Sequence, residues 1–279
     1  MKYNYVNSTK KLSIQSATVF CDALGSDSPL DVKDFGEFLK RCEALVADER
    51  LSHGDPAATS SALGNARGRW YEWLFSIGCF QFLNRAGRAY ENLLIPLPNK
   101  DKFDYLSLYE KQIYAFIEDL RTKTLAHNVT LVSSNPDFVI AKNLGQNAPI
   151  DATTVNLALL AEIDGLYENF VHSLRFDDFV GFVSVKTSVR GDRRLQLPME
   201  GALVKSYYEH LKARMWQVDA QGITYYAATM AFTKKDLEAL QTVATHSILS
   251  VNTKPEKSVN EVYKISSGDE LSSFLNFIL

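Results

Sequence analysis

The stretch FVGFVSVKTS, residues 179–188, has the pattern of a strand that lies inside a sheet. Side chains alternate between the two faces of a strand, so Ser184 and Lys186 share one face with Phe182, and two valines occupy the other. A lysine in so apolar a strand is ordinarily an edge residue whose ammonium reaches water. Lys186 is therefore either an edge lysine or a functional group placed beside a hydroxyl.

Short β-rich runs lie on both sides of this strand, at residues 93–98, 129–134, 137–142, 223–232 and 246–251. Helical patterns separate them, near residues 106–125, 154–170, 199–215, 233–240 and 257–264. Strands that alternate with helices predict an α/β or α+β fold, in which a mixed sheet is flanked by helices.

The first third of the chain is predicted to be helical. Residues 32–50 carry apolar side chains three and four positions apart, and an aromatic-rich helix is predicted over residues 69–82. Glycine, proline and serine in residues 51–68 predict a loop between them. Because no repeat or long linker divides the chain, we predict a single domain over residues 1–279. Its helical N-terminal layer covers about 1–90 and its sheet-containing core about 91–279.

Composition excludes several classes of protein. The 279 residues are 46% hydrophobic and 23% charged, which is unlike a disordered, collagen-like or disulfide-rich chain. Cys21, Cys42 and Cys79 are odd in number and have no CxxC spacing, so we predict buried free thiols in a reducing compartment. The N-terminus lacks an apolar targeting segment, and no run of about 18 apolar residues could span a bilayer. We therefore expect a cytoplasmic bacterial protein without a membrane partner.

The charge of the chain is low overall but is concentrated locally. A formal net charge of −3 gives no general attraction to nucleic acids. Residues 186–194 (KTSVRGDRR) nevertheless contain four basic residues and one acidic residue. A small basic segment on an acidic body is expected of a protein that meets a polyanion at one cleft.

Asp137 follows a proline and directly precedes an apolar strand. By itself such a Pro-Asp pair is a common turn. Together, an aspartate at the start of one strand and Lys186 on a neighbouring strand form the framework of metal-dependent phosphodiester hydrolysis. There a carboxylate holds Mg²⁺, and an ammonium orients water or stabilises charge. This pair resembles the PD-(D/E)XK nucleases, with Ser184 at the position where that pattern has an acid.

Two glutamates stand out on physical grounds. Glu72 lies between a tyrosine and a tryptophan, where a carboxylate is costly unless it is paired or functional. Pro198 suits the first turn of a helix, which predicts that Glu200 lies in that turn, where the helix dipole favours a carboxylate. The alternative is that Glu200 is an ordinary surface residue at a helix start.

The run KTSVRGDRRLQLPMEG, residues 186–201, resembles the signature of the CCGG-cutting type II restriction endonucleases, particularly the branch that cuts R/CCGGY. The similarity continues through Asn65, residues 67–72, 134–137, 205–216 and 242–248, from about residue 30 to the C-terminus. In that family a helix after the strand supplies the acid missing at Ser184, and Glu200 occupies the matching position. The resemblance implies that Asp137 and Glu200 bind Mg²⁺, that Lys186 positions the attacking water, and that Ser184 and Glu72 support the site.

The basic segment has the side chains that G·C base pairs require. Arginine can donate two hydrogen bonds to guanine, and aspartate can accept one from cytosine N4. The resemblance assigns this reading role to Arg190, Asp192 and Arg193, and suggests that Asn65 lies near the outer base pair. The alternative is a solvated charged turn.

The resemblance implies Mg²⁺-dependent cleavage of double-stranded DNA before the first C of CCGG, which leaves 5′ overhangs of four bases and 5′-phosphates. A palindromic site matches a homodimer at least, and the family suggests a tetramer with the region of Trp216 between dimers. Two alternatives remain: a structure-specific or repair nuclease of the same fold, and a catalytically inactive sequence-specific DNA-binding protein. The arginine-rich segment argues against the first. The presence of Asp137, Lys186 and Glu200 argues against the second.

Overall fold

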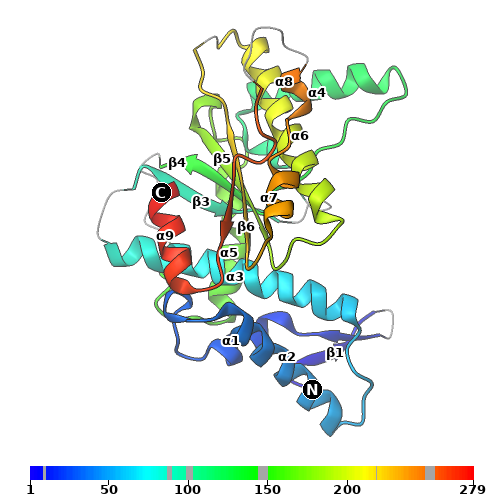
Figure 1. The fold of residues 1–279 in the computed structure, drawn as a ribbon, viewed down its shortest axis with the longest axis vertical. Coiled ribbons are helices and arrows are strands. Elements are labelled where there is room, and N and C mark those ends of the chain that lie inside the picture. The colour runs from blue at the N-terminus through cyan, green and yellow to red at the C-terminus, as the bar shows by residue number, and fades with distance from the viewer. Residues whose placement is uncertain (9–10, 87–89, 99–102, 144–149, 218, 249–254) are drawn as a thin grey trace.

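The computed structural model describes most of the chain (Figure 1). The described residues are 1–8, 11–86, 90–98, 103–143, 150–217, 219–248 and 255–279.

A five-stranded mixed sheet forms the centre of the described structure. In spatial order its strands are β3 (Asn92–Pro96), β4 (Phe138–Lys142), β5 (Phe179–Lys186), β6 (Thr224–Thr229) and β7 (Glu261–Lys264). Neighbours from β3 to β5 are antiparallel, whereas β5, β6 and β7 run parallel. The predicted mixed sheet flanked by helices is confirmed.

The central strand β5 shows the predicted alternation. Val183 and Val185 belong to one hydrophobic cluster, and Phe182 belongs to the cluster on the opposite face of the sheet. Because β5 is buried on both faces, its side chains are fixed by packing on either side. Both ends of this strand therefore hold a defined position between two helical layers.

The first layer is formed mainly by the N-terminal helices. It contains α1 (Ser16–Leu24), α2 (Phe35–Ser52), α3 (Ser60–Ala86), α5 (Leu157–Gly165) and α9 (Gly268–Ile278). A short hairpin of β1 (Asn4–Val6) and β2 (Leu12–Ile14) lies beside α2 and α3. In Figure 1, α3 runs across the molecule between the sheet and the pair α1 and α2.

The second layer covers the opposite face. It consists of α4 (Lys111–Leu125) and α6 (Arg193–Arg214), with the short helices α7 (Lys234–Leu240) and α8 (Thr245–Ile248) packed against α6. Short 3-10 helices lie at Pro29–Asp31, Tyr105–Leu108, Leu166–Phe170 and Phe176–Asp178.

The predicted loop over residues 51–68 is wrong in its second half, because α3 already begins at Ser60. The Thr59 hydroxyl accepts the Ala62 N–H at 3.2 Å, which is the hydrogen bond of a helix N-cap. This cap and the packing of the later turns outweigh the helix-weakening glycines Gly64 and Gly68. Asn65 therefore lies on a helix rather than in a loop.

Three predicted elements near the sheet are also wrong. Residues 129–134 are not a strand; the Val132 carbonyl instead accepts the Tyr207 hydroxyl at 2.8 Å. The strand expected at 246–251 is helical up to Ile248, and its remainder lies outside the described residues. Residues 257–264 do not form the expected helix. Their last four residues form strand β7, because pairing with β6 satisfies their backbone hydrogen bonds. Helix α9 was not predicted.

Helix α6 begins at Arg193, six residues before the predicted helix at 199–215. Pro198 therefore lies inside the helix rather than in its first turn, and Glu200 lies about two turns from the start. The helix dipole falls off within the first turn, so it does not account for Glu200 at this position. Glu200 is buried, with 8% of its surface exposed, so it is not a surface residue at a helix start.

The three cysteines are free thiols. Cys42 and Cys79 are buried, as predicted, whereas Cys21 is only half-buried. No helix within the described residues combines the length and the apolar character that crossing a bilayer requires.

Close packing at Gly201 sets the distance between α6 and the sheet. A Cβ atom at this residue would lie 2.2 Å from the Ser258 carbonyl oxygen and 3.1 Å from the Tyr225 ring. Such contacts require the helix or the Ser258 segment to move. The neighbouring Glu200 would move with the helix.

We predict that Gly201→Ala lowers the free energy of unfolding by about 1 to 3 kcal/mol, because the site is already filled. Urea unfolding followed by circular dichroism measures this change. Gly64→Ala is the matched control, since its Cβ would meet nothing within 4 Å on helix α3. Alanine is the better helix former, so the control should be neutral or stabilising by up to about 1 kcal/mol. Equal effects in the two variants would contradict this account.

Candidate active site

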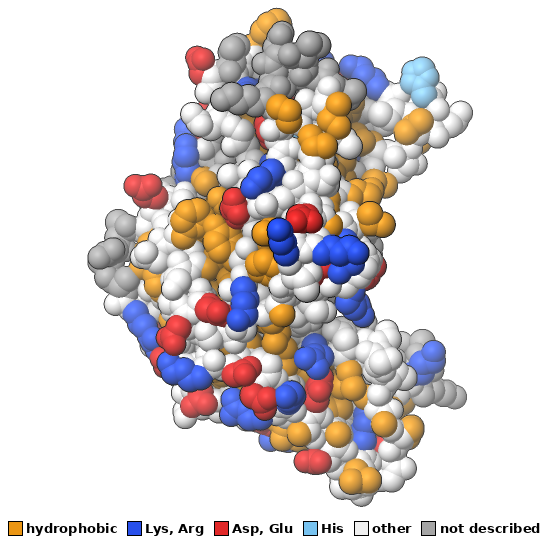
Figure 2. Space-filling model, in the orientation of Figure 1, with side chains coloured by type: hydrophobic (Ala, Val, Ile, Leu, Met, Phe, Trp, Pro, Cys, Tyr) orange, Lys and Arg blue, Asp and Glu red, His pale blue; other side chains and the backbone are white. Residues whose placement is uncertain are grey.

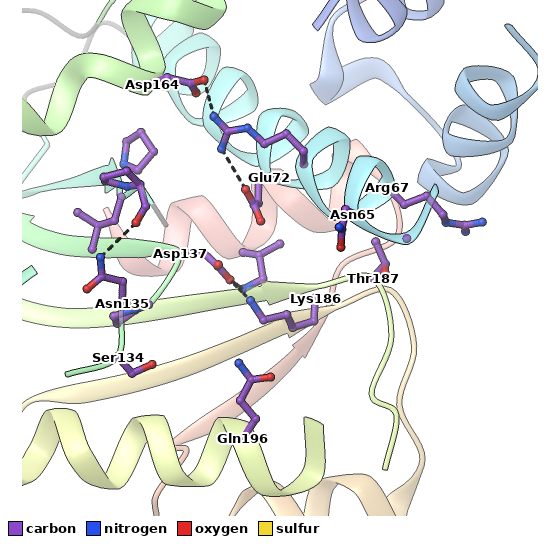
Figure 3. Close-up of a pocket in the computed structure, with 18 of the residues that line it drawn as sticks. Asn65, Arg67, Glu72, Ser134, Asn135, Asp137, Asp164, Lys186, Thr187 and Gln196 are labelled. Atoms are coloured by element: carbon purple, nitrogen blue, oxygen red, sulfur yellow. Dashed lines mark hydrogen bonds and ion pairs between the residues drawn. The ribbon is translucent and has the colours of Figure 1, made fainter. Parts of the chain in front are cut away.

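A cleft of about 1500 Å³ opens between helix α3 and the ends of β5 and α6. Its walls include the segment that leads into β4, the start of α6, and a part of α5. In Figure 3, Asn65 and Glu72 project from α3 on one side of the cleft, and Asp137 and Lys186 lie at the sheet. On the face of the molecule drawn in Figure 2, acidic and basic side chains are interspersed without a large field of either sign.

Asp137 and Lys186, which the sequence assigns to neighbouring strands, are in direct contact. The Lys186 ammonium donates to Asp137 Oδ2 at 2.7 Å, and the backbone N–H of Val185 donates to the same oxygen at 2.6 Å. Asp137 directly precedes β4, the antiparallel neighbour of β5. The contact therefore joins the start of one strand to the end of the next.

Lys186 remains charged in spite of its burial. Burial alone would lower its pKa, but the pKa is raised because the Asp137 carboxylate attracts and hydrogen bonds the ammonium, with weaker attraction from Glu72 and Glu200. Only 16% of the side chain is exposed. Lys186 is therefore a largely buried cation beside carboxylates, rather than an edge lysine that extends into water.

Glu72 enters the cleft from α3. The pKa of its carboxyl is raised to about 7, first because the side chain is buried and second because Asp137 is negatively charged, whereas Arg69 and Lys186 oppose the rise. Arg69 donates to Glu72 at 3.1 Å and also pairs with Asp164 of α5. Trp73 donates to the same Asp164 at 3.1 Å. The costly environment inferred from the sequence is real, and Arg69 is the partner that compensates for it in part.

Glu200 is held at the opposite wall by hydrogen bonds. Its Oε2 accepts from the Tyr225 hydroxyl at 2.9 Å and from Ser184 at 3.4 Å. Its Oε1 accepts from the Gln196 amide at 2.8 Å. Ser184 also lies 2.8 Å from the Tyr225 hydroxyl. The structure therefore brings Ser184 and Glu200 together, as the sequence predicted, and adds Tyr225 and Gln196.

Sequence reasoning missed four residues of this arrangement: Arg69, Asp164, Gln196 and Tyr225. Arg69 could have been found, because it lies three positions before Glu72 on a helix, at the spacing of an ion pair. Gln196 is likewise four positions before Glu200. Asp164 and Tyr225 come from distant elements, and nothing local in the sequence connects them to the site.

Three of the four predicted reading residues, Asn65, Arg190 and Arg193, line the cleft, whereas Asp192 lies outside its lining and beside the two arginines. Arg190 and Asp192 are exposed, at 69% and 63% of their side-chain surfaces, and Arg193 is 26% exposed. Carboxylate oxygens of Asp192 lie 3.8 Å from Arg190 and 3.9 Å from Arg193. Arg190, Arg193 and Asn65 all line the cleft, with Asn65 on the wall formed by α3.

The oxygen donors of the cleft suit a hard cation. Asp137, Glu72 and Glu200 are close enough to influence the Lys186 ammonium. Among the described residues, however, no three acidic, histidine or cysteine side chains form a complete metal cage. Magnesium usually keeps several waters and takes one or two carboxylates together with substrate phosphates. The residues of this cleft fit that mode of binding.

The raised pKa of Glu72 predicts a pH-dependent stability. The pKa of this carboxyl rises from 4.5 to about 7 on folding, so its ionised form destabilises the folded state relative to its neutral form. The destabilisation is absent below about pH 4.5, grows as the pH rises from 4.5 to 7, and is complete once the pH exceeds the pKa of the folded state, about 7. Glu72→Gln removes this titration. We predict that the stability of the variant relative to the wild type rises by about 1 to 3 kcal/mol between pH 5 and pH 8.

Urea unfolding of both proteins at a series of pH values measures this difference. Parallel stability curves for Glu72→Gln and the wild type would show that Glu72 has an ordinary pKa.

Comparisons with known proteins agree with this geometry. The family model described as Cfr10I/Bse634I restriction endonuclease matches residues 4–279. The type II restriction enzyme Cfr10I of Citrobacter freundii is 36% identical over 276 residues, covering 96% of this chain and 95% of that enzyme.

Two solved structures are similar along nearly the whole chain. The Bse634I restriction endonuclease has a TM-score of 0.86, and the type IIF restriction endonuclease Bse634I with cognate DNA has a TM-score of 0.87. Each is 29% identical and covers 99% of this chain and 96% of the other. The family model and the similarity along almost the full length show that the chain belongs to the Cfr10I/Bse634I restriction endonuclease family.

Proposed function

We propose that the protein is a Mg²⁺-dependent type II deoxyribonuclease that cuts double-stranded DNA before the first C of an R/CCGGY-like palindrome. Cleavage there leaves 5′ CCGG overhangs and 5′-phosphates. The observation that carries this proposal is the contact between Asp137 and Lys186 at 2.7 Å, in a cleft whose mouth also presents Arg190 and Arg193. Membership of the family supports it, because one relative has been solved with its cognate DNA.

In this proposal Asp137 and Glu200 hold the Mg²⁺ ion. Bound Mg²⁺ would supply Lewis-acid stabilisation of charge on the scissile phosphate. The Lys186 ammonium orients the attacking water, and its raised pKa keeps it charged at neutral pH. Ser184 helps to orient Glu200, and Glu72 adds negative charge beside Asp137 from the α3 wall.

Recognition is proposed for the segment between β5 and α6. Arg190 and Arg193 would donate to guanines of CCGG, Asp192 would accept from a cytosine, and Asn65 would contact the outer base pair across the cleft. The two arginines lie within a few residues of Lys186, so base reading and hydrolysis would take place in one cleft.

We also propose that the protein acts as a homodimer at least, because a palindrome presents the same site to two copies. Trp216, at the end of α6, is 86% exposed, which contradicts a role as an ordinary core residue. Its exposed indole supports the further proposal of a contact between dimers in a tetramer.

Digestion of a phage genome tests the function directly. In Mg²⁺ the wild type should give discrete fragments whose sequenced 5′ ends begin with CCGG. Ends of random sequence would instead indicate a structure-specific or repair nuclease. Specific binding without cutting at any Mg²⁺ concentration would indicate an inactive DNA-binding protein.

Asp137→Ala and Lys186→Ala should each abolish this cleavage, because each removes one side of the central contact. Both variants should still bind a CCGG duplex in Ca²⁺, measured by fluorescence anisotropy, since the reading residues lie outside that contact. A loss of binding as large as the loss of cutting would contradict the assignment.

The position of the second acid is tested by an exchange between Ser184 and Glu200. Their side chains are 3.4 Å apart, so a carboxylate on either backbone can reach the same place. We predict that Glu200→Gln raises the Mg²⁺ concentration required and reduces the single-turnover rate by about 10²-fold or more, because hard cations bind through carboxylate oxygens.

The double variant Ser184→Glu with Glu200→Ser should recover part of the rate that the single variant Glu200→Ser loses, and more of it in Mn²⁺ than in Mg²⁺. Near wild-type cleavage by Glu200→Gln would leave Glu72 as the candidate for the second ligand.

A further inference from the structure

We propose that Gln196 couples base reading by Arg193 to the carboxylate of Glu200, and so acts as a positioning residue that determines specificity. The inference rests on the proposed function, since it takes Arg193 as a reading residue and Glu200 as a metal ligand. It adds a residue and a physical route by which recognition controls the site.

A continuous chain of hydrogen bonds connects the three side chains. Arg193 Nη1 donates to Gln196 Oε1 at 3.1 Å, and Gln196 Nε2 donates to Glu200 Oε1 at 2.8 Å. The residues are three and four positions apart on α6, so they follow one face of the helix. All three line the cleft.

The two oxygens of Glu200 have different surroundings. Oε2 is fixed in the interior by Tyr225, which is itself fully buried, and by Ser184. Oε1 is bound by Gln196, whose side chain is exposed at the mouth of the cleft. The bond to Oε1 is therefore the one that entering DNA can change.

Binding of a guanine by Arg193 competes with the hydrogen bond from Arg193 to Gln196. A guanine edge takes two N–H groups of one guanidinium in a fixed geometry. Turning Arg193 toward a base weakens its bond to Gln196 Oε1, and the Gln196 amide then loses the contact that orients it toward Glu200. With a wrong base, Arg193 stays on Gln196 and the amide continues to occupy Glu200 Oε1.

This arrangement gives a coupling between two ligands. If a correct base releases Glu200 for a cation, then a cation at Glu200 must increase the affinity for the correct base by the same factor. Ca²⁺ should therefore strengthen binding of a CCGG duplex more than binding of a duplex with one base pair changed. If Gln196 only stabilised α6, its removal would change the affinity for both duplexes by the same factor.

The experiment uses Gln196→Met, which has a similar size and cannot make either hydrogen bond. Gln112→Met is the matched control, because Gln112 is exposed on α4 in the second layer and does not line the cleft. Dissociation constants of both duplexes are measured in EDTA and in Ca²⁺. The cleavage ratio of the two duplexes is then measured in Mg²⁺.

We expect Ca²⁺ to increase the discrimination between duplexes in the wild type and in Gln112→Met. In Gln196→Met this increase should fall by roughly tenfold, the size of one hydrogen bond to a charged group. The preference for cutting the correct duplex should fall by a similar factor. Because Gln196→Met leaves Oε1 of the buried Glu200 without this donor, its thermal midpoint should fall below that of Gln112→Met, but this fall alone would not change the discrimination between duplexes.

An unchanged Ca²⁺ effect in Gln196→Met would overturn the inference, as would a wild type in which Ca²⁺ improves binding of both duplexes equally. Weaker binding of both duplexes without a change in their ratio would mean only a structural role and would also overturn it. In these three outcomes the wild type still cuts at CCGG. A wild type that does not cut at CCGG would instead refute the proposed function itself.

Discussion

The ion pair between Lys186 and Asp137 is the interaction on which the site depends. One oxygen of Asp137 accepts both from the lysine and from the backbone of Val185, so the carboxylate holds the side chain and the main chain of β5 at once. Taking an ammonium and a carboxylate out of water costs several kcal/mol per ion, which only close pairing and further hydrogen bonds offset. The two strand ends therefore have to stay in register for either charge to remain buried.

The sheet separates two hydrophobic clusters, and the site receives side chains from both layers. Glu72 belongs to the layer of α3, and Glu200 belongs to the layer of α6 on the opposite face. They approach the same lysine because the cleft lies at the end of β5, where the sheet no longer separates the layers. Packing on each face thus controls one of the two carboxylates. The close packing at Gly201 positions the helix that carries Glu200. The ion pair of Arg69 with Asp164 positions the arginine that binds Glu72.

The sequence was most informative where a pattern is local. Alternation identified β5 and the face that Ser184 and Lys186 share, and the apolar residues after Asp137 identified β4. Boundaries that depend on distant contacts were predicted less well. The four residues of β7 are a strand because β6 lies beside them, and α3 starts early because a threonine caps it in spite of two glycines. Tyr225 could not be connected to Glu200 without knowing that β6 pairs with β5.

Helix α3 fixes the distance between two residues of the cleft, Asn65 and Glu72. It is 27 residues long and continuous, and it carries both Asn65 and Glu72. Seven residues of α-helix span about 10 Å along its axis, and the hydrogen bonds between successive turns keep that length. Asn65 therefore cannot shift along the cleft without carrying Glu72 the same distance. In the proposed complex, any adjustment of α3 to a different outer base pair would therefore also displace the carboxylate beside Asp137.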